Sequence, residues 1–258
     1  MSVGEIFFKV EGEGEAVVLI HGLSDNLNYW ESLAVNLKKD YKVIRFDLRG
    51  HGKSQLGRDK ITIDLLCDDL YNLLNDLKIK KVNLLGFSLG GLVALDFTIR
   101  YPEYVSSLIL MSAFSHSDNH ISNVFNQFKR ALNNSFEEFY DLILPMTLCP
   151  EVIQNNKKEL EMLKIISAQN SNSKAYIESV DACLLFNTFD KLCEINCPVL
   201  ILAGSYDEIV LLNMQENLHD SIKNSKLIIF DNVKHNLLVG KNNSEVLSVL
   251  RVFLKNKK

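Results

Sequence analysis

Short apolar runs alternate with longer segments of helical period along much of the chain. The runs end in glycine or turn residues, and several are almost wholly apolar, which is typical of strands buried on both faces of a parallel sheet. This alternation predicts the α/β class, with a mostly parallel central sheet flanked by helices. The expected strands are Glu5–Val10, Val17–His21, Lys42–Asp47, Lys81–Gly86, Ser107–Ser112, Val199–Gly204 and Lys226–Phe230.

Helical period is clearest in Thr62–Leu77, where leucines recur at intervals of three and four residues. That spacing predicts an amphipathic helix whose apolar stripe packs on the core. The strand–helix rhythm stops between residues 113 and 190, where helical segments dominate. We interpret residues 113–190 as a helical cap inserted into a core formed by residues 1–112 and 191–258.

The start and end of one helix in this insertion can be placed from its polar and proline residues. Ser135 and Glu138 form a candidate capping box, which predicts a helix that begins after Ser135 and runs through Leu144. Pro145 and Pro150 follow, and we expect them to break the helical pattern.

Composition narrows the classes of function. The chain has 258 residues, of which 47% are hydrophobic and 23% charged, and its net charge is −4. No basic patch is evident, so nucleic acid is not an expected partner, and a small neutral or apolar molecule fits better. The amino-terminal segment does not resemble a signal peptide, and no apolar run is long enough to span a membrane. We therefore expect a cytoplasmic protein.

The five cysteines are an odd number without a regular spacing, which argues against a disulfide framework. Cys193 and Cys197 could suggest a metal site, but the second pair that a closed zinc site needs is missing. We expect no bound metal.

A nucleophile is indicated by Gly86-Phe87-Ser88-Leu89-Gly90, followed by Gly91. The G-x-S-x-G pattern alone is weak, but here it directly follows an apolar strand and precedes a helix. That setting defines a nucleophile elbow, in which flanking glycines allow a sharp turn that turns the serine hydroxyl outward. The alternative is an ordinary serine in a tight turn.

A serine nucleophile needs a base, and the base needs an orienting acid. His235 lies in a polar loop after the last expected strand, and Asp207 lies just past the end of the preceding one. Both, like Ser88, follow carboxyl ends of strands, where open parallel sheets place their sites. Asp231 is the rival acid, only four residues before His235. A catalytic role is not expected for the other histidines, His21, His51, His116, His120 and His219.

With these motifs in the order Ser88, Asp207, His235, the sequence resembles the α/β-hydrolase superfamily, and specifically its small carboxylesterase and lactonase branch. His21-Gly22 after a strand, the run from Asp47 to Ser54 (DLRGHGKS) and the helical insertion also match that family. The resemblance implies ester hydrolysis through an acyl-enzyme on Ser88, with no metal or organic cofactor.

The resemblance also implies an oxyanion hole built from the backbone N–H groups of Leu23 and Leu89. Leu89 qualifies by its position directly after the nucleophile. Leu23-Ser24 stands where lipases have a glycine-rich extension, which disfavours a bulky alcohol. The expected substrate is a small or medium acyl ester or a lactone.

The insertion is rich in aromatic residues, which suggests a largely apolar pocket above Ser88. Most aromatic residues at helical spacing are simply core, but a cap must face the site with some of them. Basic residues of the insertion at 129, 130, 157, 158 and 164 could meet an acidic acyl-carrier protein, although a solvated face explains them better. The expected pocket residues are His21, Trp30, Phe87, Phe125, Phe128, Phe139 and Met146.

Several alternatives remain at this point. Dehalogenases and epoxide hydrolases of this fold carry aspartate as nucleophile, which Ser88 argues against. A thioesterase, an acyl-carrier methyl-ester esterase, a cofactor-free perhydrolase and a hydrolase-fold ligand receptor all stay open, because specificity lies in the pocket rather than in the fold.

Overall fold

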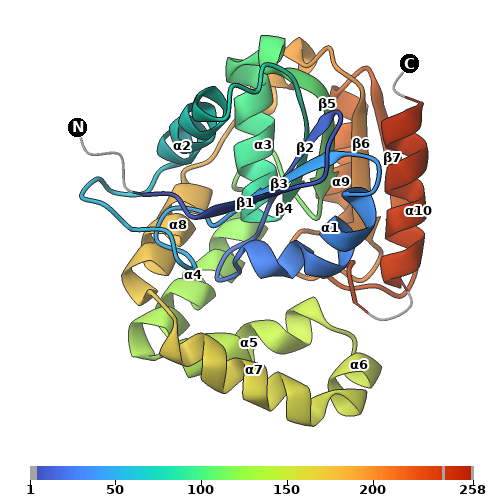
Figure 1. The fold of residues 1–258 in the computed structure, drawn as a ribbon. Coiled ribbons are helices and arrows are strands. Elements are labelled where there is room, and N and C mark those ends of the chain that lie inside the picture. The colour runs from blue at the N-terminus through green and yellow to red at the C-terminus, as the bar shows by residue number, and fades with distance from the viewer. Residues whose placement is uncertain (1–4, 240–241, 257–258) are drawn as a thin grey trace.

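The computed structural model describes residues 5–239 and 242–256. Its centre is a seven-stranded sheet in the order β1-β3-β2-β4-β5-β6-β7, in which only β1 is antiparallel to its neighbour (Figure 1). The α/β-hydrolase fold class expected from the sequence is confirmed. The strands are β1 Phe8–Glu11, β2 Ala16–Ile20, β3 Lys42–Phe46, β4 Val82–Phe87, β5 Val105–Met111, β6 Val199–Gly204 and β7 Ser225–Phe230.

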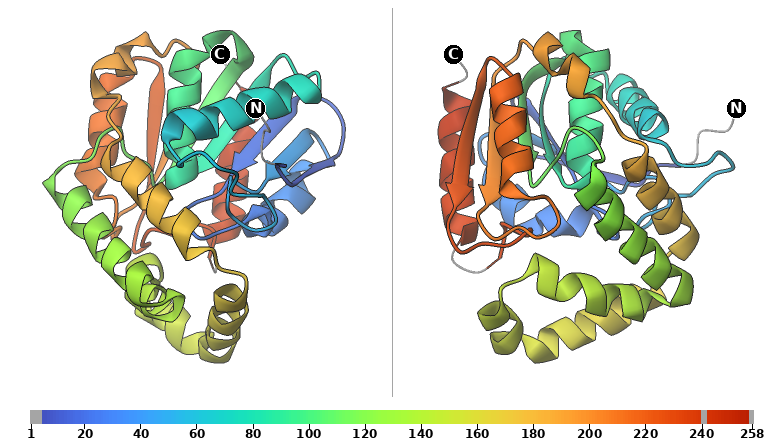
Figure 2. Two further views of the ribbon diagram at one scale, coloured as in Figure 1. Left: turned by 90° about the vertical axis from the view of Figure 1, so that its left-hand side faces the viewer. Right: turned by 180° about the vertical axis from the view of Figure 1, so that it is seen from behind.

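Side chains alternate between the two faces of the sheet, and each face is covered by its own apolar cluster. On β2, Val18 and Ile20 join one cluster, while Val17 and Leu19 join the other. Helices α2 (Ile63–Asp76), α3 (Leu89–Arg100) and α9 (Leu212–Ser221) cover the first face. Helices α1 (Glu31–Leu37) and α10 (Asn242–Lys255) cover the second (Figure 2). β2, β4 and β6 are buried along their whole length, as strands between two helical layers must be.

The periodic segments fold much as their patterns predict. α2 begins after Thr62, whose hydroxyl accepts a hydrogen bond from the Leu65 N–H at 3.1 Å and so caps the helix. β1 begins three residues later than expected, because the segment before it bonds to the loop after β3 instead: the Phe7 N–H donates to Ser54 Oγ at 2.9 Å. Short 3₁₀ helices occupy Leu27–Trp30, Pro102–Tyr104 and Phe189–Glu194.

Between the neighbouring strands β5 and β6, the chain leaves the sheet and forms a run of helices. Its two ends run side by side, because the Thr188 N–H donates to the Ser115 carbonyl at 2.8 Å and the Ser117 N–H donates to the Phe186 carbonyl at 3.0 Å. The helices are α4 Asn119–Asn134, α5 Phe136–Thr147, α6 Pro150–Asn155, α7 Lys157–Gln169 and α8 Ser173–Leu184.

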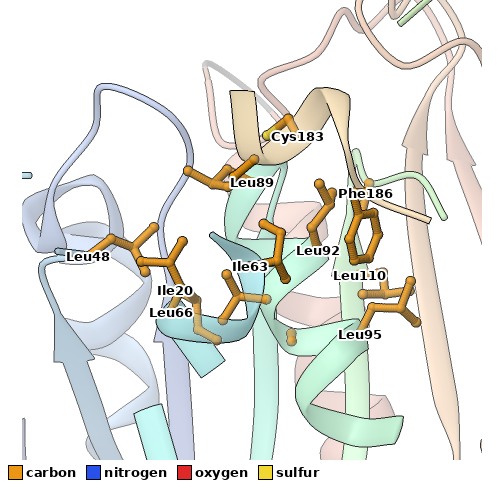
Figure 3. Close-up of a cluster of buried hydrophobic side chains, with 14 of the residues drawn as sticks. Ile20, Leu48, Ile63, Leu66, Leu89, Leu92, Leu95, Leu110, Cys183 and Phe186 are labelled. Atoms are coloured by element: carbon orange, nitrogen blue, oxygen red, sulfur yellow. The ribbon is translucent and has the colours of Figure 1, made fainter. Parts of the chain in front are cut away.

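The last helix of this insertion packs into the core beside α3. Figure 3 shows Cys183 and Phe186, at the end of α8 and just after it, beside Leu89 and Leu92 of α3. α5, α6 and α7 lie further from the sheet (Figures 1 and 2). The insertion is therefore attached through α4 and α8.

The expectation that Pro145 would break a helix is wrong, because α5 continues to Thr147 with Pro145 inside it. A proline near the end of a helix removes one backbone hydrogen bond but keeps a φ that the helix can use. Pro150 begins α6, where a missing N–H costs nothing. Ser135 caps α5 as expected, but the Glu138 carboxylate accepts from the Asn134 side chain rather than completing the capping box.

None of the helices in the described part of the chain is long and apolar enough to cross a membrane.

Candidate active site

Ser88 lies on a sharp turn between β4 and α3. Its φ of 50° is in the left-handed region, which non-glycine residues rarely adopt. The Ser88 N–H donates to the Met111 carbonyl on β5 at 2.9 Å, and the Ser88 carbonyl accepts from the Gly91 N–H at 2.8 Å. A Cβ on Gly86 would collide with the Gly90 carbonyl, and one on Gly90 with the Ile20 carbonyl. The glycines therefore allow the close packing that holds the strained serine.

Asp207 and His235 form a buried hydrogen-bonded pair. The loops after β6 and β7 bring them together, with His235 Nδ1 2.8 Å from Asp207 Oδ2. Because a carboxylate only accepts, Nδ1 carries the proton and Nε2 is left as the acceptor. Asp207 Oδ1 accepts from the backbone N–H groups of Ile209 and Val210, both at 2.9 Å. These three bonds fix the carboxylate and, through it, the orientation of the imidazole.

Ser88 and His235 border the same cavity, which has a volume of about 580 Å³. Among the described residues, no hydrogen bond joins Ser88 Oγ to the His235 ring, and neither Ser88 Oγ nor His235 Nε2 has another partner there. Catalytic hydrogen bonds are often longer in the unliganded state than with substrate bound. The structure thus brings the serine and the Asp207–His235 pair to one cavity without closing the last bond between them.

The two expected oxyanion donors flank the serine. Leu89 is the first residue of α3, and Leu23 lies in the loop after β2 and borders the cavity. Within the described chain, neither the Leu23 N–H nor the Leu89 N–H donates to another group, so both are available to a ligand. The first N–H groups of a helix also favour negative charge.

The loop that carries Leu23 is held by the Asp47–Ser54 run. His21 Nδ1 donates to the Gly22 carbonyl at 2.8 Å, and His21 Nε2 accepts from the Leu48 N–H at 2.9 Å. Asp47 Oδ1 accepts from the Leu27 N–H at 2.7 Å. Burial lowers the pKa of His21 to about 4, so the neutral ring keeps these bonds at neutral pH. His21 thus supports the loop.

Four of the seven expected pocket residues border the cavity: Phe87, Phe125, Phe128 and Phe139. His21, Trp30 and Met146 do not. Both His21 ring nitrogens bond to backbone, and Trp30 is fully buried behind Tyr29, whose ring meets it edge-on with centroids 4.8 Å apart. Met146 instead packs against the apolar cluster under the insertion. Helical spacing indicates that a residue is apolar, but not which neighbour it faces.

Sequence reasoning missed Ser112, at the carboxyl end of β5. Its φ is 51°, and its hydroxyl donates to the His235 carbonyl at 2.8 Å. Ser112 is fully buried, and the bond ties the histidine loop to the strand beside β4. A polar residue at the end of a buried strand was the available signal.

The insertion also contacts the histidine loop. The Asn236 N–H donates to the Thr147 carbonyl at 3.1 Å, and Lys234 Nζ donates to the Pro145 carbonyl at 2.7 Å. Asn236 Oδ1 accepts from the Tyr29 hydroxyl at 3.1 Å. The end of α5, the loop after β7 and the loop after β2 therefore form one hydrogen-bonded rim around the cavity.

The remaining sequence candidates lie elsewhere. Asp231 is exposed and does not border the cavity, and His120 Nε2 contacts the Glu208 carbonyl at 3.1 Å. Cys193 and Cys197 are free thiols, and in the described residues no group of three or more His, Cys, Asp or Glu could hold a metal ion. Of the basic residues in the insertion, Lys164 is paired with Asp141 at 2.7 Å and Lys129 is paired with Asp181.

Comparison with known proteins agrees with this architecture. A protein of Rhizobium rhizogenes named as a carbamate hydrolase, RutD, is 26% identical over 254 residues, covering 95% of this chain and 97% of its own. The pimeloyl-[acyl-carrier protein] methyl ester esterase of Aliivibrio fischeri is 26% identical over 260 residues, covering 96% and 97%. The enol-lactonase of Burkholderia xenovorans has a similar fold, with a TM-score of 0.91 at 20% identity over 98% and 97% of the two chains.

The sequence model of the alpha/beta hydrolase fold family matches residues 15–241, which include β2 to β7 and the insertion between β5 and β6. With this match and the sheet topology described above, the chain belongs to the α/β-hydrolase fold family and is a hydrolase of that fold.

Proposed function

We propose that this protein is a serine hydrolase that cleaves carboxylic esters, small to medium acyl esters or lactones, through an acyl-enzyme on Ser88. The observation that carries the proposal is the buried Asp207–His235 pair, whose imidazole borders the same cavity as the strained Ser88. A serine hydroxyl on an elbow, a neutral imidazole and a fixed carboxylate are the groups that acyl transfer needs.

In the proposed reaction, His235 Nε2 takes the proton from Ser88 Oγ as that oxygen attacks the ester carbonyl. The negative charge that develops on the carbonyl oxygen is stabilised by the N–H groups of Leu23 and Leu89, each worth about 3 kcal/mol of barrier in comparable sites. Asp207 stabilises the imidazolium that forms. His235 then returns the proton to the leaving alcohol, and the acyl group stays on Ser88.

The second half repeats these steps with water. His235 removes a proton from the water, whose oxygen attacks the acyl-enzyme, and Ser88 regains its proton as the acid leaves. The insertion acts as a cap: Phe125, Phe128 and Phe139 give the cavity an apolar wall that favours an acyl chain over water.

The test is hydrolysis of p-nitrophenyl esters, thioesters and lactones of graded acyl length by wild type and Ser88→Ala. We expect ester turnover that Ser88→Ala reduces by about 10⁴-fold or more, because nucleophile and base act as one unit. Ser106→Ala, at the opposite end of β5, is the matched control and retains activity. A fluorophosphonate should label wild type at Ser88 and leave the Ser88→Ala variant unlabelled.

Equal ester turnover by wild type and Ser88→Ala would contradict the proposal. Tight retention of product after a single turnover would favour the receptor alternative, and a preference for thioesters would favour a thioesterase.

A further inference from the structure

One carboxyl group borders the cavity without a partner of its own. Asp25 follows the oxyanion loop, and in the described part of the chain its carboxylate accepts no hydrogen bond and forms no ion pair. The backbone aims it there: Ser24 has a left-handed φ of 61°, and the Asp25 N–H closes the turn onto the Gly22 carbonyl at 3.3 Å. Carboxylates removed from water normally have a protein partner, so an unpaired one in a cavity suggests a ligand.

The position of Asp25 is fixed by its neighbours. A Cβ placed on Gly22 would lie 3.0 Å from the Phe87 ring and 3.3 Å from Asp25 Oδ2, so ring and carboxylate lie side by side over Gly22. The Phe87 ring stacks on Tyr29, with centroids 4.8 Å apart, and lies 5.1 Å from the ring of His235. Asp25 is therefore on the side of the cavity that holds His235.

That side receives the leaving group in the proposed reaction, because His235 must protonate the leaving oxygen. The apolar wall from α4 and α5 remains for the acyl chain. The cavity thus has a polar end, where Asp25 lies among the aromatic rings of Tyr29 and Phe87, and an apolar end.

Charge on Asp25 depends on pH in the relevant range. Burial raises the pKa of Asp25 to about 7, and nearby His235 lowers it in part. The other titratable groups near it are tyrosines: burial raises the pKa of Tyr29 well above its usual value and that of Tyr176 to about 12, so both stay neutral. A positive charge beside Asp25 would favour its ionised form.

We propose that Asp25 binds a positively charged nitrogen in the leaving group of the substrate, so that the preferred ester joins an apolar acyl chain to a cationic alcohol. This deepens, and rests on, the proposed ester hydrolysis. The aromatic rings beside Asp25 add cation–π attraction to the charge pairing.

The test compares two esters of nearly the same shape, butanoylcholine and 3,3-dimethylbutyl butanoate, which differ by a quaternary nitrogen in place of a carbon. The ratio of their kcat/KM values cancels effects common to both, including the protonation of His235. We expect wild type to favour the choline ester, and Asp25→Asn to lower the ratio by about tenfold or more. Asp231→Asn, a nearby exposed carboxylate outside the cavity, is the control and keeps the ratio.

Wild type alone provides a second measurement. Because the choline nitrogen cannot titrate, the ratio should rise about tenfold from pH 6 to pH 8 as Asp25 ionises. An Asp25→Asn ratio equal to that of wild type, or a wild-type ratio that falls with rising pH, would overturn the proposal.

Binding separates this proposal from ester hydrolysis itself. Calorimetry with butanoylcholine on Ser88→Ala, and on Ser88→Ala with Asp25→Asn, measures recognition without turnover. If no ester is hydrolysed but the second variant binds at least about tenfold more weakly, the reaction fails and the cation site stands. If hydrolysis depends on Ser88 but binding ignores Asp25, only the cation site fails.

Discussion

The loops at the carboxyl ends of the strands and the outer helices of the insertion border the same cavity, but they are held in place very differently. Asp207 is fixed by His235 and two backbone N–H groups, and Ser112 anchors the His235 carbonyl. α7 buries no residue completely, and Met162 and Ile165 on it are 63% and 52% exposed. The chemistry is thus built on rigid elements, and the outer wall is the adaptable part.

Within the insertion the same contrast repeats between its inner and outer helices. α4 and α8 each bury six residues, whereas α5 buries two and α6 and α7 bury none. Few buried contacts mean a low cost of local opening. We therefore expect α5 to α7 to admit substrate while α4 and α8 hold the base of the cavity.

The largest expected effect comes from changing the fixed side, at Asp207. In Asp207→Asn, the two backbone N–H groups that now bond Oδ1 would retain the amide oxygen, so the NH₂ group would face His235. The ring would then have to accept at Nδ1 and carry its proton on Nε2, the wrong tautomer for a base. We expect kcat for ester hydrolysis to fall by about 10⁴-fold with little change in fold.

Asp231→Asn separates this effect from a general change of charge. Asp231 was the rival acid in the sequence, and it is exposed, so kcat should stay within about twofold of wild type. If the Asp231 variant lost activity and the Asp207 variant kept it, the assignment of the acid would be reversed.

The contrast between inner and outer helices is tested by stability. Phe128 on α4 is buried against Phe125 and Phe139, with ring centroids 5.3 and 5.6 Å away. Phe128→Ala should lower the free energy of unfolding by about 3–5 kcal/mol, whereas Met162→Ala on α7 should change it by about 0.5 kcal/mol or less. Urea denaturation of both variants measures this, and similar losses would mean that the outer helices are as firmly packed as the inner ones.

What could be read from the sequence follows from how local each signal is. Apolar runs and their end points place Ser88, Asp207 and His235 after three strands, and the structure has them after β4, β6 and β7. The bond from Ser112 to His235 spans 123 residues and leaves no periodic trace. Trp30 and Met146 were expected in the pocket because they are apolar and near the site, but the direction of a side chain depends on tertiary packing. Asp25 is a single acidic residue whose meaning comes only from the cavity around it.

The smallest expected effect lies at the junction of the two regions, where His51 of the core contacts Tyr176 of α8, with ring centroids 4.9 Å apart. Burial, with a smaller contribution from His21, lowers the pKa of His51 to about 3, while in the unfolded chain it is near 6.5. Between these values the unfolded state binds a proton that the folded state does not. Stability is therefore fully present above about pH 6.5 and falls as the pH is lowered toward 3, by about 1.4 kcal/mol per pH unit.

At pH 5 this amounts to about 2 kcal/mol from His51 relative to pH 8. His51→Asn, which keeps an N–H near the position of Nδ1 and so near the Arg49 carbonyl, should be less stable than wild type at pH 8 but lose about 2 kcal/mol less on going to pH 5. Urea midpoints at intervals from pH 8 to pH 5 measure the difference, and from pH 8 to pH 7 the two curves should run parallel, because His51 stays almost wholly neutral in both states. Parallel curves down to pH 5 would mean that water or a rearranged junction already accommodates a charged His51, and that the base of the insertion is less rigid than its buried contacts imply.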